Sequence, residues 1–434
     1  MDGSSPTEPT TTIAERLRGL LPPDGLAEHE AVWANLTRIA AQPSVAPALL
    51  ECLPHLVSAL RASANPARAL LGLDRLATAM ETPERLYRLL AARPHLVDIL
   101  VTLFAGSRFL TEIVLRHPDT LERLGDRDDL ARPRDAATIY AEARQALAGT
   151  GAFEVRLDRL RRLQRVELLR IGSCDLVGLA DLYTVTAQLS HLADGLIRAA
   201  LDVAGEATGV APDGLMIAAL GKLGGQELNY SSDVDLVFLT KGEVAPSTIL
   251  ARALVDVLTR VTGEGFLYRV DLRLRPWGSS GPLVSSLGAY LAYLEKCARL
   301  WERQALLKAR LVVGDERARA AFVERTSALL FAPGPDPRAE VRAMKHRIET
   351  QLDASGAAWG EVKLGRGSIR DVEFVTQYLQ LRHGAQFPEL RSANTLAALA
   401  RLHARGLLAP DAHRALSEGY TFLRPVEHYL QMMD

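Results

Sequence analysis

The stretch LGKLGGQELNYSSDVDL, residues 220–236, decides how the middle of this chain folds. It continues a short apolar run, residues 215–220, which is typical of a buried strand. The turn that follows is rich in glycine and contains Gly221, Lys222, Gly224 and Gly225. Glycines allow backbone N–H groups to approach a phosphate closely, and a lysine adds positive charge. The spacing matches neither GxxxxGK[ST] nor GxGxxG, so two common nucleotide-binding turns are excluded.

The turn leads into Asp233-Val234-Asp235, at the start of a second predicted strand, Val234 to Leu239. Because side chains alternate along a strand, Asp233 and Asp235 should share one face while Val234 points into the core. Such a pair alone is typical of solvated aspartates at a strand end. After a buried strand and a glycine-rich turn it favours a metal site, since Mg²⁺ prefers a few carboxylates with phosphate oxygens and water.

A third predicted strand, Phe266 to Leu274, supplies another carboxylate. The two-residue period places Arg269, Asp271 and Arg273, followed by Arg275, on one face. A carboxylate between arginines suits a site that handles metal and phosphate together, although a surface strand with salt bridges shows the same pattern. We therefore predict Asp271 as a third metal ligand.

Helical periodicity surrounds these strands. The predicted helical segments are 13–124, 136–169, 248–262, 287–311 and 338 to the end. The expected fold is therefore α+β and predominantly helical, with a central sheet flanked by helical domains. The expected parts are a disordered tail (1–12), a helical domain (13–130), a sheet-containing domain (131–335) and a second helical domain (336–434), truncated at its C-terminus.

Two helical segments carry charge without a defined chemistry. The segment 136–169 has a basic stripe, whose members are Arg156, Arg159, Arg161, Arg162 and Arg165, with Arg170 just beyond. A solvated face with Arg–Glu pairs is the more usual meaning of such a stripe, and a surface for phosphate or an acidic partner is the alternative. Near residue 368 a glycine-rich turn opens a helix, with Ser368 as the expected N-cap and the helix start as a possible anion site.

Bulk composition narrows the class of protein. The 434 residues contain 51 basic and 52 acidic side chains, which argues against a broad nucleic-acid or membrane-binding surface. No apolar run is long enough to span a bilayer, and residues 1–12 lack the apolar segment of a signal peptide. Cys52, Cys174 and Cys297 lie far apart, as expected for unpaired thiols of a cytoplasmic protein. The helical pattern at 414–433 lacks a terminating signal, so we expect a longer parent protein.

The strand, glycine turn, Asp-x-Asp and later Asp resemble the polymerase-beta-type nucleotidyltransferases. Their hG[GS] and Dh[DE]h pattern is met by Gly224-Gly225 with a short spacer, or by Gly221-Lys222 with a longer spacer but no second small residue. Longer segments resemble the glutamine synthetase adenylyltransferase/adenylyl-removing enzymes. These segments are GSRFLTEIVLRHPDTLERL (106–124), GKLGGQELNYSSDVDLVFL (221–239), YRVDLRLRPWGSSGPLV (268–284), WERQALLKAR (301–310) and KLGRGSIRDVEFVTQYL (363–379).

That family joins two homologous units, of which the N-terminal one removes AMP from a glutamine synthetase tyrosine and the C-terminal one adds it. This sequence has one unit, about 200 residues after Met1. Its ELNYSSDVDL and GSIRDVEF resemble the N-terminal unit, whereas the C-terminal unit tends to read ELGYASDLD and GITDIEF. The resemblance thus implies phosphorolysis of adenylyl-tyrosine to give ADP. ATP-dependent adenylylation, or a non-catalytic module that binds glutamine synthetase or a PII-type signalling protein, are the alternatives.

The resemblance also implies a set of site residues and ligands. Asp233, Asp235 and Asp271 would be catalytic and hold Mg²⁺. Phosphate or nucleotide would contact Gly221, Lys222, Gly224, Gly225, Ser232, Arg273, Arg275, Lys308 and Arg310. The implied partners are glutamine synthetase, inorganic phosphate, ADP or ATP and a PII-type protein, with neither nucleic acid nor membrane. One departure is Cys174, which stands where the family often has an arginine, so that the role of that arginine is in doubt here.

Overall fold

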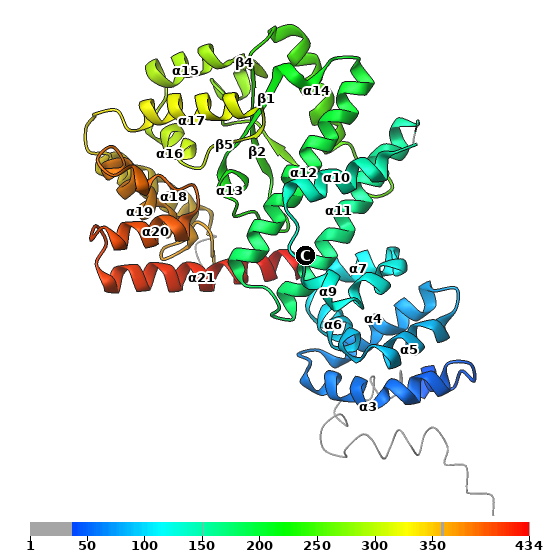
Figure 1. Cartoon of the computed structure of the whole chain (residues 1–434). Helices are drawn as coiled ribbons and strands as arrows, with labels where there is room; N and C mark the ends of the chain where they lie inside the picture. The colour runs from blue at the N-terminus through cyan, green and yellow to red at the C-terminus, as the bar shows by residue number, and fades with distance from the viewer. Residues whose placement is uncertain (1–36, 150, 357–359, 434) are drawn as a thin grey trace, which may run out of the picture. The chain divides into compact units, whose positions relative to one another are not determined.

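The computed structural model describes residues 37–149, 151–356 and 360–433 (Figure 1). The predicted tail, residues 1–12, lies outside this part. The chain forms two compact units. The first holds residues up to 132 with 168–180 and 432–434, and the second holds 133–167 and 181–431. A further boundary near residue 335, inside the second unit, stays a prediction.

The first unit is helical in its described residues. Its helices are α3 (Ala46–Ala62), α4 (Pro66–Ala79), α5 (Pro83–Ala92), α6 (Pro94–Gly106), α7 (Arg108–Arg116), α8 (Leu121–Leu124) and α9 (Arg127–Ala131). Proline occupies the first position of α4, α5 and α6, where its missing N–H has no helical partner to lose. Gly72 lets α4 and α6 pack closely, since a Cβ there would lie 2.5 Å from Cγ of Phe104.

No single described helix is long and apolar enough to cross a membrane. Helices α5 and α6 reach that length and composition only as a pair, which is bent by 117° at the break. The apolar residues of α6 are buried among the other helices, as expected of core positions.

Cys174 also belongs to the first unit. Its buried thiol donates to the carbonyl oxygen of Leu130 (3.2 Å), and Arg170 donates to the same oxygen (3.2 Å). Burial raises the pKa of the Cys174 thiol. Cys174 therefore packs in a helical core, and all three cysteines are free, as the sequence predicts.

The second unit is built around a mixed five-stranded sheet. Its strands are β1 (Leu215–Ala219), β2 (Val234–Thr240), β3 (Val270–Asp271), β4 (Val284–Ser286) and β5 (Arg310–Val313). The order is β3-β2-β1-β5, and β4 also pairs with β2. Strand β1 is antiparallel to both neighbours, whereas β2 is parallel to β3 and β4. The predicted α+β class, predominantly helical with a central sheet, is confirmed.

Helices cover the sheet on both faces (Figure 1). Helices α15 (Leu287–Lys296) and α17 (Glu316–Leu330) share a core with Met216, Ala218 and Val237 on one face. Helices α12 (Leu182–Thr208) and α14 (Val244–Thr259) pack together and contact strands β5 and β2, respectively. The sheet is thus a buried platform, and its functional side chains come from strand ends.

Further helices follow the sheet and complete the unit. They are α16 (Leu300–Leu306), α18 (Arg338–Ser355), α19 (Ile369–His383), α20 (Thr395–Ala404) and α21 (Pro410–Met433), of which the last reaches into both units. Helices α19, α20 and α21 form their own apolar cluster, in which Leu399, Leu402 and Tyr420 are buried.

Three predicted elements differ from the structure. The helix expected over 136–169 is two helices, α10 (Ala136–Leu147) and α11 (Phe153–Leu176). The helix expected over 287–311 is two helices, α15 and α16, and residues 310–313 form β5 and bury Leu311 and Val312 against β1. The strand expected over 266–274 shrinks to β3, because the Asp271 carboxylate accepts a hydrogen bond from the Arg273 N–H (2.8 Å) and the chain turns away.

The arginines of the basic stripe largely form contacts with other parts of the protein. Arg161 is fully buried and donates to the carbonyl oxygens of Leu157, Val257, Arg260 and Gly265. Arg156 pairs with Glu206, and Arg159 donates to the carbonyl of Ala146 (2.7 Å). These contacts favour a structural role for the stripe over a binding surface for phosphate or an acidic partner. Arg161 also fixes the segment that leads into β3.

Replacing Arg161 with Met should lower the free energy of unfolding by about 3 kcal/mol, because several interior carbonyls lose a charged donor. Thermal unfolding followed by circular dichroism measures the change. Arg162→Met, at an exposed position of the same helix, is the control and should cost less than about 1 kcal/mol. Equal stability of the two variants would contradict the assigned role.

Candidate functional site

The glycine-rich turn lies directly against a carboxylate of β2. Its first residues form the short helix α13 (Gly221–Gly224). Gly221 has φ +56°, and a Cβ there would lie 2.2 Å from Oδ2 of Asp235. At Gly224 a Cβ would lie 2.0 Å from the carbonyl oxygen of Lys308. Only glycine permits these two approaches, which bring the turn to the carboxylates on one side and to the segment before β5 on the other.

Three carboxylates meet at the start of β2. Strands β2 and β3 run parallel with Asp235 opposite Asp271, and Asp233 directly precedes β2. Val234 and Leu236 are fully buried, so Asp235 points away from the core as the alternation predicts. Burial raises the pKa of Asp235 to about 6, and the charges of Asp271 and Asp233 add to the rise. The three acids are therefore close enough to repel one another.

Arginines hold the two outer carboxylates. Arg269 donates to Asp233 (2.5 Å), and Arg273 binds Asp271 through its side chain (2.5 Å) and its backbone N–H. The Arg273 hydrogen bond lowers the pKa of Asp271. With the side chains placed in this way, the described residues contain no group of three His, Cys, Asp or Glu that could hold a metal ion. The oxygen donors fit Mg²⁺ in kind, but the arginines must release them first.

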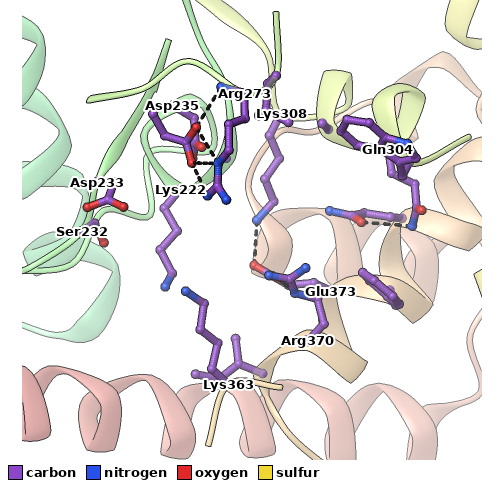
Figure 2. Close-up of a pocket in the computed structure, with 18 of the residues that line it drawn as sticks. Lys222, Ser232, Asp233, Asp235, Arg273, Gln304, Lys308, Lys363, Arg370 and Glu373 are labelled. Carbon is purple, nitrogen blue, oxygen red and sulfur yellow. Dashed lines mark hydrogen bonds and ion pairs between the residues drawn. The ribbon is translucent and has the colours of Figure 1, made fainter. Parts of the chain in front are cut away.

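The acids line one side of a cavity of about 720 Å³, which Figure 2 shows. Of the predicted phosphate-binding residues, Gly221, Lys222, Ser232, Arg273 and Lys308 line it. Lys363 and Arg370, which the sequence analysis did not single out, bring further positive charge to the same space. The cavity thus joins a carboxylate cluster to several cations, as a site for phosphate groups and metal requires.

Two predicted arginines serve other purposes. Arg275 donates to the carbonyl oxygens of Leu272 and Ser279, and so holds the loop after β3. Arg310 pairs with Asp194 (2.7 Å) and donates to the carbonyls of Leu223 and Gly224. Arg310 therefore fixes the glycine-rich turn from behind. Neither arginine lines the cavity described above, so a contact of either with phosphate stays a prediction.

The two lysines of the cavity differ in charge balance. Lys222 pairs with Glu427 (2.8 Å), yet burial lowers the pKa of Lys222 to about 8. Lys308 lies between Glu227 (2.6 Å) and Glu373 (3.1 Å). Burial opposes the charge of Lys308, but these carboxylates outweigh it and hold the pKa of Lys308 above its usual value. Two carboxylates thus neutralise Lys308, whereas Lys222 pairs with one carboxylate, that of Glu427, among the residues that the structure describes.

The expected anion site at the start of α19 is wrong. Ser368 occupies the N-cap position, but its hydroxyl donates to the carbonyl of Lys363 (2.9 Å). The N–H groups of Ile369 and Arg370 are bound to the carbonyls of Val362 and Lys363. This segment contributes the side chains of Lys363 and Arg370 to the cavity. The cationic residues that recur in KLGRGSIR are the sequence signal that could have revealed them.

Comparison with known proteins agrees with this architecture. A family model described as "Glutamate-ammonia ligase adenylyltransferase" matches residues 97–325, more than half of the chain. This chain belongs to the glutamate-ammonia ligase adenylyltransferase family. A second model, described as "GlnD PII-uridylyltransferase", matches residues 338–434 of this adenylyltransferase-family chain. The resemblance seen in the sequence is confirmed.

Curated relatives carry the name "Bifunctional glutamine synthetase adenylyltransferase/adenylyl-removing enzyme". One from Streptomyces avermitilis is 38% identical over 417 residues, covering 90% of this chain and 40% of the relative. One from Chromobacterium violaceum is 34% identical over 442 residues, covering 98% of this chain and 48% of the relative. This adenylyltransferase-family chain therefore spans less than half the length of these relatives.

The Gly221→Ala variant should be destabilised by more than its backbone conformation alone explains. Gly209 also has a positive φ, +68°, but a Cβ there meets nothing within 4 Å. Gly209→Ala should therefore report the backbone cost, about 1–2 kcal/mol, whereas Gly221→Ala adds the clash with Asp235. Combining Gly221→Ala with Asp235→Ala should recover at least about 1 kcal/mol of that excess. An additive double variant in thermal unfolding would refute the close approach.

The raised pKa of Asp235 predicts a pH-dependent stability. Since its folded-state pKa, about 6, exceeds the ordinary 3.8, the folded protein binds this proton more tightly than the unfolded chain does. The resulting stabilisation is full below pH 4 and disappears as the pH rises through 6. Asp235→Asn should therefore be more stable than the wild type at pH 8 without metal, by about 3 kcal/mol, and equally stable near pH 4.

Urea denaturation at the two pH values measures this difference. Asp256→Asn, at a surface ion pair with Arg260, should show no comparable gain at pH 8. A wild type more stable than Asp235→Asn at pH 8 without metal would contradict the electrostatic description of the site.

Proposed function

We propose that this chain removes AMP from an adenylylated tyrosine of glutamine synthetase by metal-dependent phosphorolysis. The observation that carries the proposal is the single cavity shared by Asp233, Asp235 and Asp271 and by the cations Lys222, Lys363 and Arg370. The direction of reaction is supported by the segments 227–236 and 367–374, which resemble the AMP-removing unit of the family. The names of the relatives supply glutamine synthetase as the protein substrate.

The reaction needs placement of charge more than removal of a proton. An oxygen of inorganic phosphate forms a bond to the AMP phosphorus, and the bond from that phosphorus to the tyrosine oxygen breaks. The products are ADP and tyrosine, whose oxygen takes the proton that hydrogen phosphate gives up. Since phosphate is already ionised, the protein's task is to bring two anions together. Lys222, Lys363 and Arg370 offset that charge inside the cavity.

We assign Asp233, Asp235 and Asp271 as the residues that would hold Mg²⁺, which supplies charge stabilisation and orients phosphate oxygens when it is bound. Burial and the charges of Asp271 and Asp233 raise the pKa of Asp235, so a divalent ion bound beside it would favour its ionised form. Arg269 and Arg273 would exchange a carboxylate partner for a phosphate oxygen. Both arginines line the cavity, so this exchange needs side-chain rotation only.

Other features of the proposal follow from the family. We expect the protein in the cytoplasm, where its protein substrate and phosphate are found. A PII-type signalling protein is the proposed regulator, a role supported by the match of residues 338–434 to a model named for PII uridylylation. No nucleic acid or membrane has a part in this mechanism.

Replacing Asp233 and Asp235 together with Asn should abolish AMP removal, a loss of at least about 1000-fold, because the metal ligands are gone. The assay supplies adenylylated glutamine synthetase, phosphate and Mg²⁺ and detects ADP. Asp256→Asn, outside the cavity, should keep wild-type activity. ADP release that persists in the double variant would refute the assigned carboxylates.

A second assay tests direction. Unmodified glutamine synthetase is incubated with the chain, Mg²⁺ and ATP labelled in the α-phosphate. Transfer of label to glutamine synthetase would favour adenylylation over its reversal. Glutamine synthetase binding without either reaction would favour a non-catalytic module.

A further inference from the structure

The cavity has a second end, opposite in chemistry to the carboxylates. Figure 2 shows Gln304 far across the cavity from Asp233, with Lys308 between them. This end is formed by α16, α18 and α19, which contact one another. Its lining residues are Trp301 and Gln304 from α16, Met344 from α18, and Phe374 and Gln377 from α19. No carboxylate or amine is among these five side chains.

The amide of Gln304, at this end of the cavity, is incompletely paired. The Gln304 Nε2 donates to Oε1 of Gln377 over 3.3 Å, a long hydrogen bond. Oε1 of Gln304, a residue that is only 4% exposed, is buried and has no hydrogen-bond partner among the residues that the structure describes. An unpaired buried oxygen costs about 1–3 kcal/mol, so a ligand that donates a hydrogen bond to this oxygen would recover that free energy. The contact with Gln377 fixes which end of the Gln304 amide faces which way.

The surrounding side chains suit a flat heterocycle. Trp301 is 40% exposed, and Phe374 and Met344 also line this end of the cavity. Aromatic rings and a thioether contact the faces of a purine, while an amide contacts its edge. Adenine presents an amino donor at position 6 beside a ring-nitrogen acceptor, the pattern that a glutamine amide complements. Guanine presents an oxygen at position 6, which would face the Gln304 oxygen.

We propose that this end of the cavity binds the adenine base and that Gln304 determines base specificity. The proposal rests on the proposed function, in that the ligand is an adenine nucleotide whose phosphates lie toward the carboxylates. The 6-amino group donates to Oε1 of Gln304, while Nε2 of Gln304 keeps its contact with Oε1 of Gln377. Gln377 is the positioning residue that holds the Gln304 amide in the orientation that rejects guanine.

Nucleotide binding to the whole chain tests this without glutamine synthetase. Isothermal titration calorimetry with Mg²⁺ compares ADP, GDP and purine riboside diphosphate, which is ADP without the 6-amino group. The wild type should bind ADP roughly tenfold or more tightly than either analogue. This comparison uses unaltered protein, so folding defects cannot affect it.

Variants then assign the effect to residues. Gln304→Met should weaken ADP binding roughly tenfold and make ADP and purine riboside diphosphate bind alike. Gln377→Met should mainly reduce the preference for ADP over GDP. The control is Gln351→Met, at an exposed position of α18, which should match the wild type.

The outcomes separate this inference from the proposed reaction. A wild type that binds ADP and purine riboside diphosphate equally, or a folded Gln304→Met variant that keeps the ADP preference, overturns the inference. In that case the aromatic end is free for another group, such as the substrate tyrosine. Base preference carried by Gln304 in a chain that releases no AMP from glutamine synthetase would instead uphold this inference and refute the proposed reaction.

Discussion

The buried charge of Lys308 is the constraint on which the cavity depends. Its ammonium group contacts Glu227 after the glycine-rich turn, Glu373 on α19 and Thr395 at the start of α20. A buried charge is tolerated only when it is paired, and removing one partner from such a cluster typically costs about 3–5 kcal/mol. The turn and the C-terminal helices therefore occupy one mutual arrangement, because any other leaves the lysine or a glutamate uncompensated.

Arg424 extends this network along α21. It donates to the carbonyl of Glu227 (2.7 Å) and to Oδ1 of Asn229 (2.5 Å), in the loop that leads to Asp233. Gln431 accepts from the N–H of Ser231 (3.2 Å) in the same loop. The loop has little secondary structure of its own, so side chains of α21 satisfy its polar groups. The position of the first aspartate is thus determined by a helix distant in sequence.

Local patterns made the carboxylate end of the site predictable. Alternation in Val234 to Leu239 placed Asp235 correctly, and the glycines of the turn proved necessary where φ is positive or the backbone is crowded. The full length of β3 was overestimated because periodicity does not reveal that the Asp271 side chain competes for the backbone of Arg273. Strand β5 was missed because a short apolar run next to a helix has no distinguishing period.

Local sequence patterns could not predict the long-range contacts of the site. Lys308 and Arg310 were both expected at phosphate, but burial and partners from other elements determine their roles. The sequence did not reveal Gln304 and Gln377 as site residues, because a single glutamine in a helix suggests no function until its neighbours in space are known. The glycine-rich turn receives contacts from residues far later in the chain, with 205 positions between Lys222 and Glu427 and 195 between Asn229 and Arg424. A growing polypeptide on the ribosome therefore cannot complete this cavity until the last turns of α21 have left the exit tunnel.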